Sequence, residues 1–173
     1  MILIAVGSSL SYSGRSPEAI VESALGALGR FAALTGRSRL YASPAWPDPA
    51  DPPFVNAVAA IETALSPTAL LAALRAVEAG FGRKRSRPNA PRTLDLDLID
   101  YHGLIMDSAG PPALVLPHPR MASRDFVLAP LADIAPGWRH PVLGLSPEAL
   151  LAAAPKGGAR PLGGAASILQ RSG

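Results

Sequence analysis

Residues 91–99 have the sequence Pro-Arg-Thr-Leu-Asp-Leu-Asp-Leu-Ile. Side chains of a β-strand point to alternate faces, and this segment alternates strictly from Thr93 to Ile99. One face would carry only leucines, and the other would carry the acids Asp95 and Asp97. Asp100 has the parity of the leucine face, and we expect it in a turn with residues 101–103. The segment therefore predicts a strand with one apolar face and a carboxylate pair on the other.

The residues before this strand predict the remaining elements of the core. Two helices are expected to begin at Ser-Pro pairs, Ser16-Pro17 and Ser66-Pro67, because a serine hydroxyl caps a helix and proline suits its first turn. The expected elements are strands over 2–6, 39–41, 54–62 and 93–99, and helices over 17–34 and 67–80. This order is the βαββαβ pattern of the ferredoxin-like α+β folds. We expect an antiparallel sheet covered by helices.

The last third of the chain is less regular and predicts C-terminal additions to that core. We expect short strands over 104–106 and 113–116, and helices over 123–131 and 147–154. From Lys156 onward Gly, Ala, Ser and Pro dominate without amphipathic period. The sequence therefore predicts one domain over 1–159 and a poorly ordered tail over 160–173, whose removal should leave activity nearly unchanged.

Composition limits the classes of protein that the chain can represent. Its 173 residues are 49% hydrophobic and 17% charged, with a net charge of +3, which fits one globular domain. No cysteine is present, which excludes disulfides, thiol nucleophiles and thiolate metal sites. The apolar runs are shorter than the ~20 residues of a membrane span, and no signal peptide is evident. We expect a cytoplasmic monomer with no nucleic-acid partner and no membrane partner.

Two clusters of charged residues suggest phosphate and metal chemistry. Asp95 and Asp97 would project from one strand face with roots about 7 Å apart, a spacing at which Mg²⁺ can be bound between carboxylates. An ordinary exposed strand face with two acids is the alternative. Five basic residues lie within ten positions, and they suit phosphate oxygens or form a solvated loop: Arg83, Lys84, Arg85, Arg87 and Arg92.

The segment Pro117-His118-Pro119-Arg120 predicts a rigid loop that carries an imidazole, with Arg124 close behind. His118 could contact a phosphate there, or it could be an exposed or structural histidine. The chain contains no GxxxxGK[ST] or GxGxxG sequence, and its histidines lack zinc-ligand spacing. A nucleotide site would therefore be of an uncommon kind.

These motifs together resemble 6-hydroxymethyl-7,8-dihydropterin pyrophosphokinase of folate biosynthesis. The resemblance spans about residues 1–142 and rests on Pro-Arg-Thr-Leu-Asp-Leu-Asp at 91–97. Weaker motifs support it in order: Gly-Ser-Ser at 7–9, Tyr-Ala-Ser-Pro-Ala at 41–45, Phe-Val-Asn-Ala-Val at 54–58 and Leu-Pro-His-Pro-Arg-Met at 116–121. It implies the ferredoxin-like fold and transfer of pyrophosphate from ATP to the pterin hydroxymethyl group, with release of AMP.

The resemblance also implies a role for individual residues. Asp95 and Asp97 would bind two Mg²⁺ ions. The polyphosphate would be contacted by Arg83, Arg92, His118 and Arg124. The pterin pocket would be lined by Ser43, Pro44 and Trp46. The pterin ring would stack between Phe54 and Phe126, and Asn56 would form hydrogen bonds with its polar edge. Glu78 would support the site from its helix.

Three positions depart from the family pattern: Ser9 replaces an asparagine, Asn89 a tryptophan and Pro119 an aromatic residue. No general base is identified from the residues. Two other functions stay open: an RNA-binding module on a ferredoxin-like sheet, although its aromatic signature is absent, and a kinase acting on another heteroaromatic alcohol.

Overall fold

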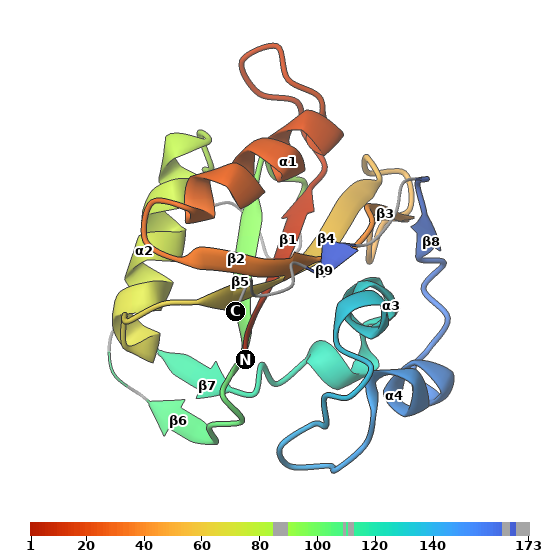
Figure 1. The fold of residues 1–173 in the computed structure, drawn as a ribbon. Coiled ribbons are helices and arrows are strands. Elements are labelled where there is room, and N and C mark those ends of the chain that lie inside the picture. Colours follow the sequence, from red (N-terminus) through yellow and green to blue (C-terminus); the bar gives the residue numbers. More distant parts are fainter. Residues whose placement is uncertain (85–89, 109, 111–112, 164–166, 169–173) are drawn as a thin grey trace.

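The computed structural model describes residues 1–84, 90–108, 110, 113–163 and 167–168. A twisted antiparallel sheet forms the centre of the molecule (Figure 1), and its main strands run in the order β5-β1-β4-β2. Their bounds are β1 Ile2–Ser8, β2 Ala33–Arg37, β4 Phe54–Glu62 and β5 Asp95–Tyr101. Strand β3, Tyr41–Ser43, pairs with the other half of β4. With helices between these strands, the order confirms the predicted ferredoxin-like α+β core.

Helices α1 (Pro17–Leu28) and α2 (Pro67–Gly80) cover one face of the sheet. Each begins as predicted, because the hydroxyls of Ser16 and Ser66 accept hydrogen bonds from the backbone three residues on. Beneath them lies an apolar core that includes Leu94, just before β5, and Leu96 and Leu98 of β5. The alternation in the sequence therefore identified the buried face correctly.

The opposite face is covered by helices α3 (Asp125–Ile134) and α4 (Pro147–Ala153), which follow the short 3₁₀ turn η1 (Met121–Ser123). They enclose a second apolar cluster that includes Leu3, Val58 and Ile99. Strands β6 (Met106–Ser108) and β7 (Leu114–Leu116) form a separate two-stranded sheet. No helix in the described part of the chain is long and apolar enough to span a bilayer.

The first predicted helix, over 17–34, is six residues too long, because α1 ends at Leu28. Ala33–Arg37 instead forms β2, with Leu34 opposite Ile61 of β4. Helical spacing alone could not show that pairing, which satisfies the backbone of this segment in the sheet. Ser38 follows β2 directly, and its hydroxyl accepts a hydrogen bond from the Val58 backbone N–H.

The predicted position of Asp100 is wrong. It lies within β5 and is only 1% exposed, and the pairing of β5 with β1 shifts between Ile4–Leu98 and Leu3–Asp100. One extra residue in a strand reverses the faces of those that follow. Asp100 therefore lies on the same face as Asp97, buried, with its Oδ2 accepting a hydrogen bond from the Gly103 N–H at 3.1 Å.

The C-terminal segment is attached to the sheet at two points, in contrast to the predicted unanchored tail. Arg160–Pro161 forms β8 beside β3, and Ser167–Ile168 forms β9 beside β2. Residues 164–166 and 169–173 lie outside the described residues. The domain boundary at residue 159 stays a prediction, but the premise that the following residues lack contacts does not hold for β8.

Candidate active site

Asp95 lies between two arginines at the start of β5. Its Oδ1 is 2.7 Å from Nη1 of Arg83, and its Oδ2 is 3.0 Å from Nη1 of Arg92. The three side chains are 19–25% exposed, so they contact solvent on one side only. Arg83 follows α2 and Arg92 precedes β5, so the sheet and helix bring together residues that the sequence separates. Arg85, Arg87 and Asn89 lie outside the described residues.

Glu78 anchors this cluster from the interior. Its carboxylate, 8% exposed, pairs with Arg83 and accepts a hydrogen bond of 2.7 Å from the backbone N–H of Leu96. Leu96 lies between Asp95 and Asp97, so the bond fixes β5 between the two acids. Burial raises the pKa of Glu78, while the Leu96 N–H and Arg83 stabilise the charged form. The supporting role of Glu78 stays a prediction, and its contacts with Arg83 and Leu96 are consistent with it.

Asp97 is the second acid on this face, two residues beyond Asp95. Its Oδ2 lies 3.8 Å from both His118 Nε2 and Arg124 Nη1, which is too long for a direct hydrogen bond. Burial and, next, the Asp95 carboxylate raise the pKa of Asp97 to about 6. The pair therefore lies between two groups of cationic or polar side chains, one on each side.

The donor set fits Mg²⁺, because carboxylate oxygens are the ligands that this hard cation prefers. Within the described ranges no group of three or more His, Asp or Glu side chains could hold a metal ion. Asp95 and Asp97 would therefore provide the protein ligands, and phosphate oxygens and water would complete the shell, as is usual for magnesium with nucleotides.

His118 is held against the end of β5. Its backbone N–H donates to the Ile99 carbonyl at 2.9 Å, and its Nδ1 accepts from the Arg120 N–H at 3.2 Å. Burial first, and then Arg124 and Arg120, lower the pKa of His118 to about 4. At neutral pH the ring is therefore uncharged, and its Nε2–H on the Asp97 side can donate to an oxygen.

The residues assigned to the pterin divide between strands and exposed loop. Ser43 pairs with Phe54 across β3 and β4, and the Asn56 side-chain amide donates to the Ser43 hydroxyl at 2.9 Å. Ser43 and Asn56 are buried and Phe54 is half-buried. The loop residues differ: Pro44 is exposed, and Trp46 is 70% exposed. The strands thus fix the polar contacts, and the structure does not bring Trp46 into a packed wall.

Gly7, to which sequence reasoning gave no role, joins the two halves of the site. It lies on β1 between Asn56 of β4 and Asp95 of β5. A methyl group at Gly7 would approach Asn56 Oδ1 to 3.3 Å and Phe54 Cδ1 to 3.8 Å. Glycine therefore lets β1 pass close to the residues expected to contact the pterin and to Asp95, one of the acids expected to bind Mg²⁺. The Gly-Ser-Ser segment was a visible signal, but only strand pairing shows what it faces.

Ser9, one of the three positions that the resemblance marks as departures, holds the arginine segment. Its hydroxyl accepts from the Arg92 N–H at 3.0 Å, and its own N–H donates to the Arg92 carbonyl at 3.0 Å. The neighbouring Ser8 hydroxyl donates to the Thr93 carbonyl at 2.6 Å. The loop after β1 therefore positions the backbone of Arg92, a contact that the sequence did not reveal.

Helix α3 brings the last predicted residues to the site. Arg124 precedes it, and its guanidinium carbon lies 5.5 Å from the centre of the Phe126 ring, a cation–π contact. Phe126 is half-buried, and α3 packs against β4 and β3. The end of α3 is tied back by Arg39, which donates to both Asp133 oxygens at 2.8 and 2.9 Å.

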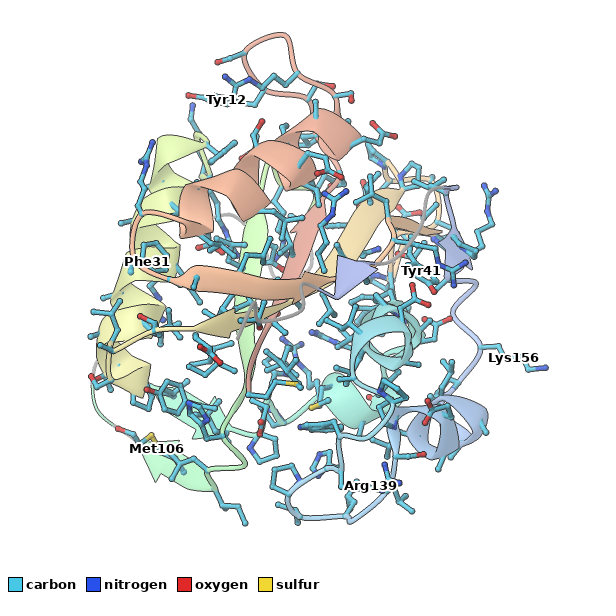
Figure 2. The ribbon with its side chains drawn as sticks, in the orientation of Figure 1. Tyr12, Phe31, Tyr41, Met106, Arg139 and Lys156 are labelled. Carbon is cyan, nitrogen blue, oxygen red and sulfur yellow. The ribbon has the colours of Figure 1, made fainter. Side chains whose placement is uncertain are left out.

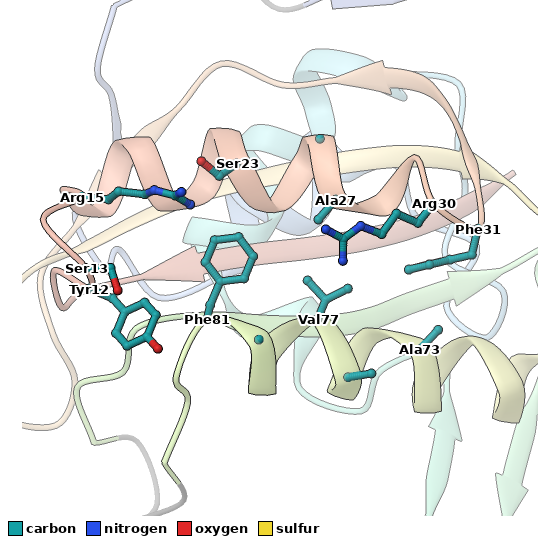
Figure 3. Close-up of a pocket in the computed structure, with 13 residues that line it drawn as sticks. Tyr12, Ser13, Arg15, Ser23, Ala27, Arg30, Phe31, Ala73, Val77 and Phe81 are labelled. Carbon is teal, nitrogen blue, oxygen red and sulfur yellow. The ribbon is translucent and has the colours of Figure 1, made fainter.

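A groove of about 700 Å³ lies elsewhere, between α1 and α2 (Figure 3). Arg15 and Arg30 reach along it and Phe81 points into it. It opens over the face covered by α1 and α2, whereas Asp95 and Asp97 point to the other face. Among the described residues that line it there is no acid and no histidine, so this groove offers no side-chain ligand for a metal ion.

The fold and this cluster define a class of protein: a ferredoxin-like α+β domain with paired carboxylates and converging arginines, suited to polyphosphate transfer. The family model of 7,8-dihydro-6-hydroxymethylpterin-pyrophosphokinase (HPPK) matches residues 3–136. The chain therefore belongs to the HPPK family. It is an ATP-dependent pyrophosphokinase, which transfers pyrophosphate to the hydroxymethyl group of 6-hydroxymethyl-7,8-dihydropterin in folate biosynthesis.

Individual relatives agree with this assignment. The chain is 43% identical over 167 residues to a 2-amino-4-hydroxy-6-hydroxymethyldihydropteridine pyrophosphokinase of Pseudomonas aeruginosa, covering 95% of this chain and 98% of the relative. A Porphyromonas gingivalis enzyme of the same name is 33% identical over 144 residues, covering 82% and 94%. The crystal structure of wild-type Plasmodium falciparum HPPK-DHPS superimposes with a TM-score of 0.67 at 13% identity. That match covers 88% of this chain and 44% of the longer protein, and supports the fold.

Proposed function

We propose that the reaction takes place between the Asp95–Asp97 face of β5 and the polar ends of β3 and β4. The observation that carries the proposal is the position of the two acids, with Arg83 and Arg92 on one side and His118 and Arg124 on the other. Two Mg²⁺ ions bound by Asp95 and Asp97 would neutralise and orient the triphosphate.

Three arginines and the neutral His118 ring stabilise the charge of the transferring group. Arg83 and Arg92 contact the β and γ phosphates, and His118 and Arg124 contact phosphate oxygens from the opposite wall. Because Asp95, Glu78 and Ser9 already position Arg83 and Arg92, and the Ile99 carbonyl holds the backbone of His118, little reorganisation is needed in the transition state. Arg83 and Arg92 exchange their contacts with Asp95 for contacts with phosphate oxygens. Each guanidinium therefore keeps an anionic partner throughout the reaction.

The pterin lies at the other end of the site, with its ring between Phe54 and Phe126. Asn56 and Ser43 read its polar edge, and Pro44 and Trp46 close the pocket from the loop. The hydroxymethyl oxygen attacks the β phosphorus in line, and the bond from that phosphorus to the α–β bridging oxygen breaks. The electron pair leaves with AMP, and the hydroxyl proton passes to water.

The test replaces one acid of the pair and compares it with an exposed acid. Asp97→Ala should lower turnover by about 10³-fold, as expected for a main electrostatic group, with the melting temperature retained. Asp107→Ala, on an exposed position of β6, should stay within about twofold of the wild type. Asp100 cannot serve as this control, as the sequence had suggested, because it is buried. Equal, mild effects of both variants would refute the metal-binding role.

Product analysis identifies the acceptor. With ATP, Mg²⁺ and 6-hydroxymethyl-7,8-dihydropterin, AMP should form in equal amount to the pterin pyrophosphate. Formation of ADP in equal amount to the phosphorylated product would contradict the assignment. Faster turnover of another heteroaromatic alcohol would mean that this alcohol, and not the pterin, is the substrate. The RNA-binding alternative finds no support in the family match. The expected number of two Mg²⁺ ions, the monomeric state and the cytoplasmic location stay predictions.

A further inference from the structure

The C-terminal segment that follows α4 is fastened to the start of α3. The backbone N–H of Ala159 donates to Asp125 Oδ2 at 3.0 Å. Asp125 lies between Arg124 and Phe126, which are assigned to the phosphates and to the pterin ring. Residues outside the matched family region, 3–136, therefore contact the element that carries two proposed site residues.

Two glycines make this approach possible. A methyl group at Gly157 would lie 2.6 Å from Asp125 Oδ1, a distance that real contacts do not reach. At Gly158, with φ +85°, a methyl group would lie 3.3 Å from Pro44 Cδ. The segment thus passes close to Asp125 on one side and to Pro44, in the pterin loop, on the other.

Beyond the glycines the chain joins the sheet beside the pterin strand. In β8, Arg160 pairs with Ala42 and Pro161 with Tyr41 of β3, and the Leu162 N–H donates to the Leu40 carbonyl at 2.8 Å. Figure 1 shows β8 alongside β3 at the edge of the molecule, and Figure 2 shows Lys156 pointing outward from the segment that leads to it. Residues 157–159, which approach Asp125 and Pro44, therefore lie between two ordered elements, α4 before them and β8 after them.

We propose that residues 157–162 are a positioning element of the pterin site, which holds the Pro44 end of the loop and the first turn of α3 at their working separation. The inference rests on the proposed roles of Pro44 and Phe126. The loop from Pro44 to Pro53 has no helix or strand, so ordering it on substrate binding costs conformational entropy. Residues 157–162 are anchored beside this loop, so they lower the entropic cost of ordering it. The effect is on the binding of the pterin rather than on the binding of ATP.

The first test is Gly157→Ala, which places a methyl group against the Asp125 carboxylate without changing any proposed site residue. We expect the KM for the pterin to rise about tenfold and the KM for ATP to rise clearly less, because Pro44 and Phe126 both border the displaced segment, whereas Arg124 alone links it to the phosphates. Gly137→Ala is the matched control, since a methyl group there meets nothing within 4 Å. An unchanged pterin KM in Gly157→Ala overturns the inference.

A second pair of variants covers the case in which Gly157→Ala does not fold. Asp125→Ala removes the acceptor of the Ala159 N–H and should raise the pterin KM, whereas Asp125→Asn keeps an acceptor oxygen and should restore it. If Asp125 only stabilises α3, both variants should have a lower melting temperature and similar KM values for the pterin. That result would overturn the inference.

Asn56→Ala separates this inference from the site assignment. If it raises the pterin KM and Gly157→Ala does not, the pterin site stands and the positioning element is refuted. If neither variant changes that KM, the site assignment fails and the inference with it. Deletion of residues 160–173, predicted from the sequence to be nearly neutral, should also raise the pterin KM because it removes β8.

Discussion

Replacing Glu78 by alanine tests how the carboxylate cluster is held together. Glu78 is 6% exposed overall, and its carboxylate is the acceptor for the Leu96 N–H within β5. Alanine cannot accept that hydrogen bond and also leaves Arg83 with Asp95 as its remaining carboxylate. We expect Glu78→Ala to lower the free energy of unfolding and to loosen Arg83.

The magnitude follows from the buried backbone group. An unsatisfied buried N–H costs about 1–3 kcal/mol. Part of this is offset, because the variant also removes a carboxylate whose pKa is raised by burial and which is therefore costly to keep charged. A net loss of about 2 kcal/mol should lower the melting temperature by roughly 4–8 °C for a chain of this length.

Thermal and urea unfolding at neutral pH measure this change. Glu22→Ala is the control, since Glu22 pairs with Arg37 at the surface and is 44% exposed; such a pair contributes about 0–1 kcal/mol. Glu78→Gln should lie between Glu78→Ala and the wild type, because its amide oxygen can still accept from Leu96. If Glu78→Ala is as stable as Glu22→Ala, the bond to β5 does not hold the site and the reasoning fails.

Two further predictions concern stability away from the reacting groups. Burial lowers the pKa of His140, whose Nδ1 accepts from two backbone N–H groups, so the unfolded chain binds a proton below about pH 6.5 before the native state does. Native stability should therefore fall as the pH drops through that range, and His140→Asn should flatten the dependence of the melting temperature on pH; equal slopes would contradict this. Asp133→Ala should lower the midpoint of urea unfolding, because Arg39 loses its paired hydrogen bonds. The exposed Glu148→Ala is its control, and equal midpoints for the two variants would refute a stabilising role for the Arg39 contact.

The carboxylate pair and the leucine face could be predicted from the sequence, because both depend on strand alternation alone. Side chains two residues apart in a strand share a face whatever surrounds them, so Asp95 and Asp97 had to converge once β5 formed. The helix starts at Ser16 and Ser66 depend only on local backbone hydrogen bonds, and they too were correct. Strand alternation and helix capping depend only on residues close together in the chain, so they can be predicted from the sequence.

Other features were decided by pairing between distant segments. The end of α1 and the formation of β2 depend on β4, and the face of Asp100 depends on an irregularity opposite β1. The local sequence around Leu28 or Asp100 does not show which strand it will pair with, because register depends on both strands of a pair. The same reason explains why Gly7 was overlooked as the position facing both Asn56 and Asp95.

By itself the sequence determined the order of the core elements, the acid pair and the family motifs, since each depends on residues close together in the chain. Only the tertiary structure decided that Glu78 binds the backbone of β5, that Ser9 holds Arg92, and that the segment after α4 returns to β3. These contacts join residues far apart in the chain, and buried polar groups select their partners only when packing brings them together.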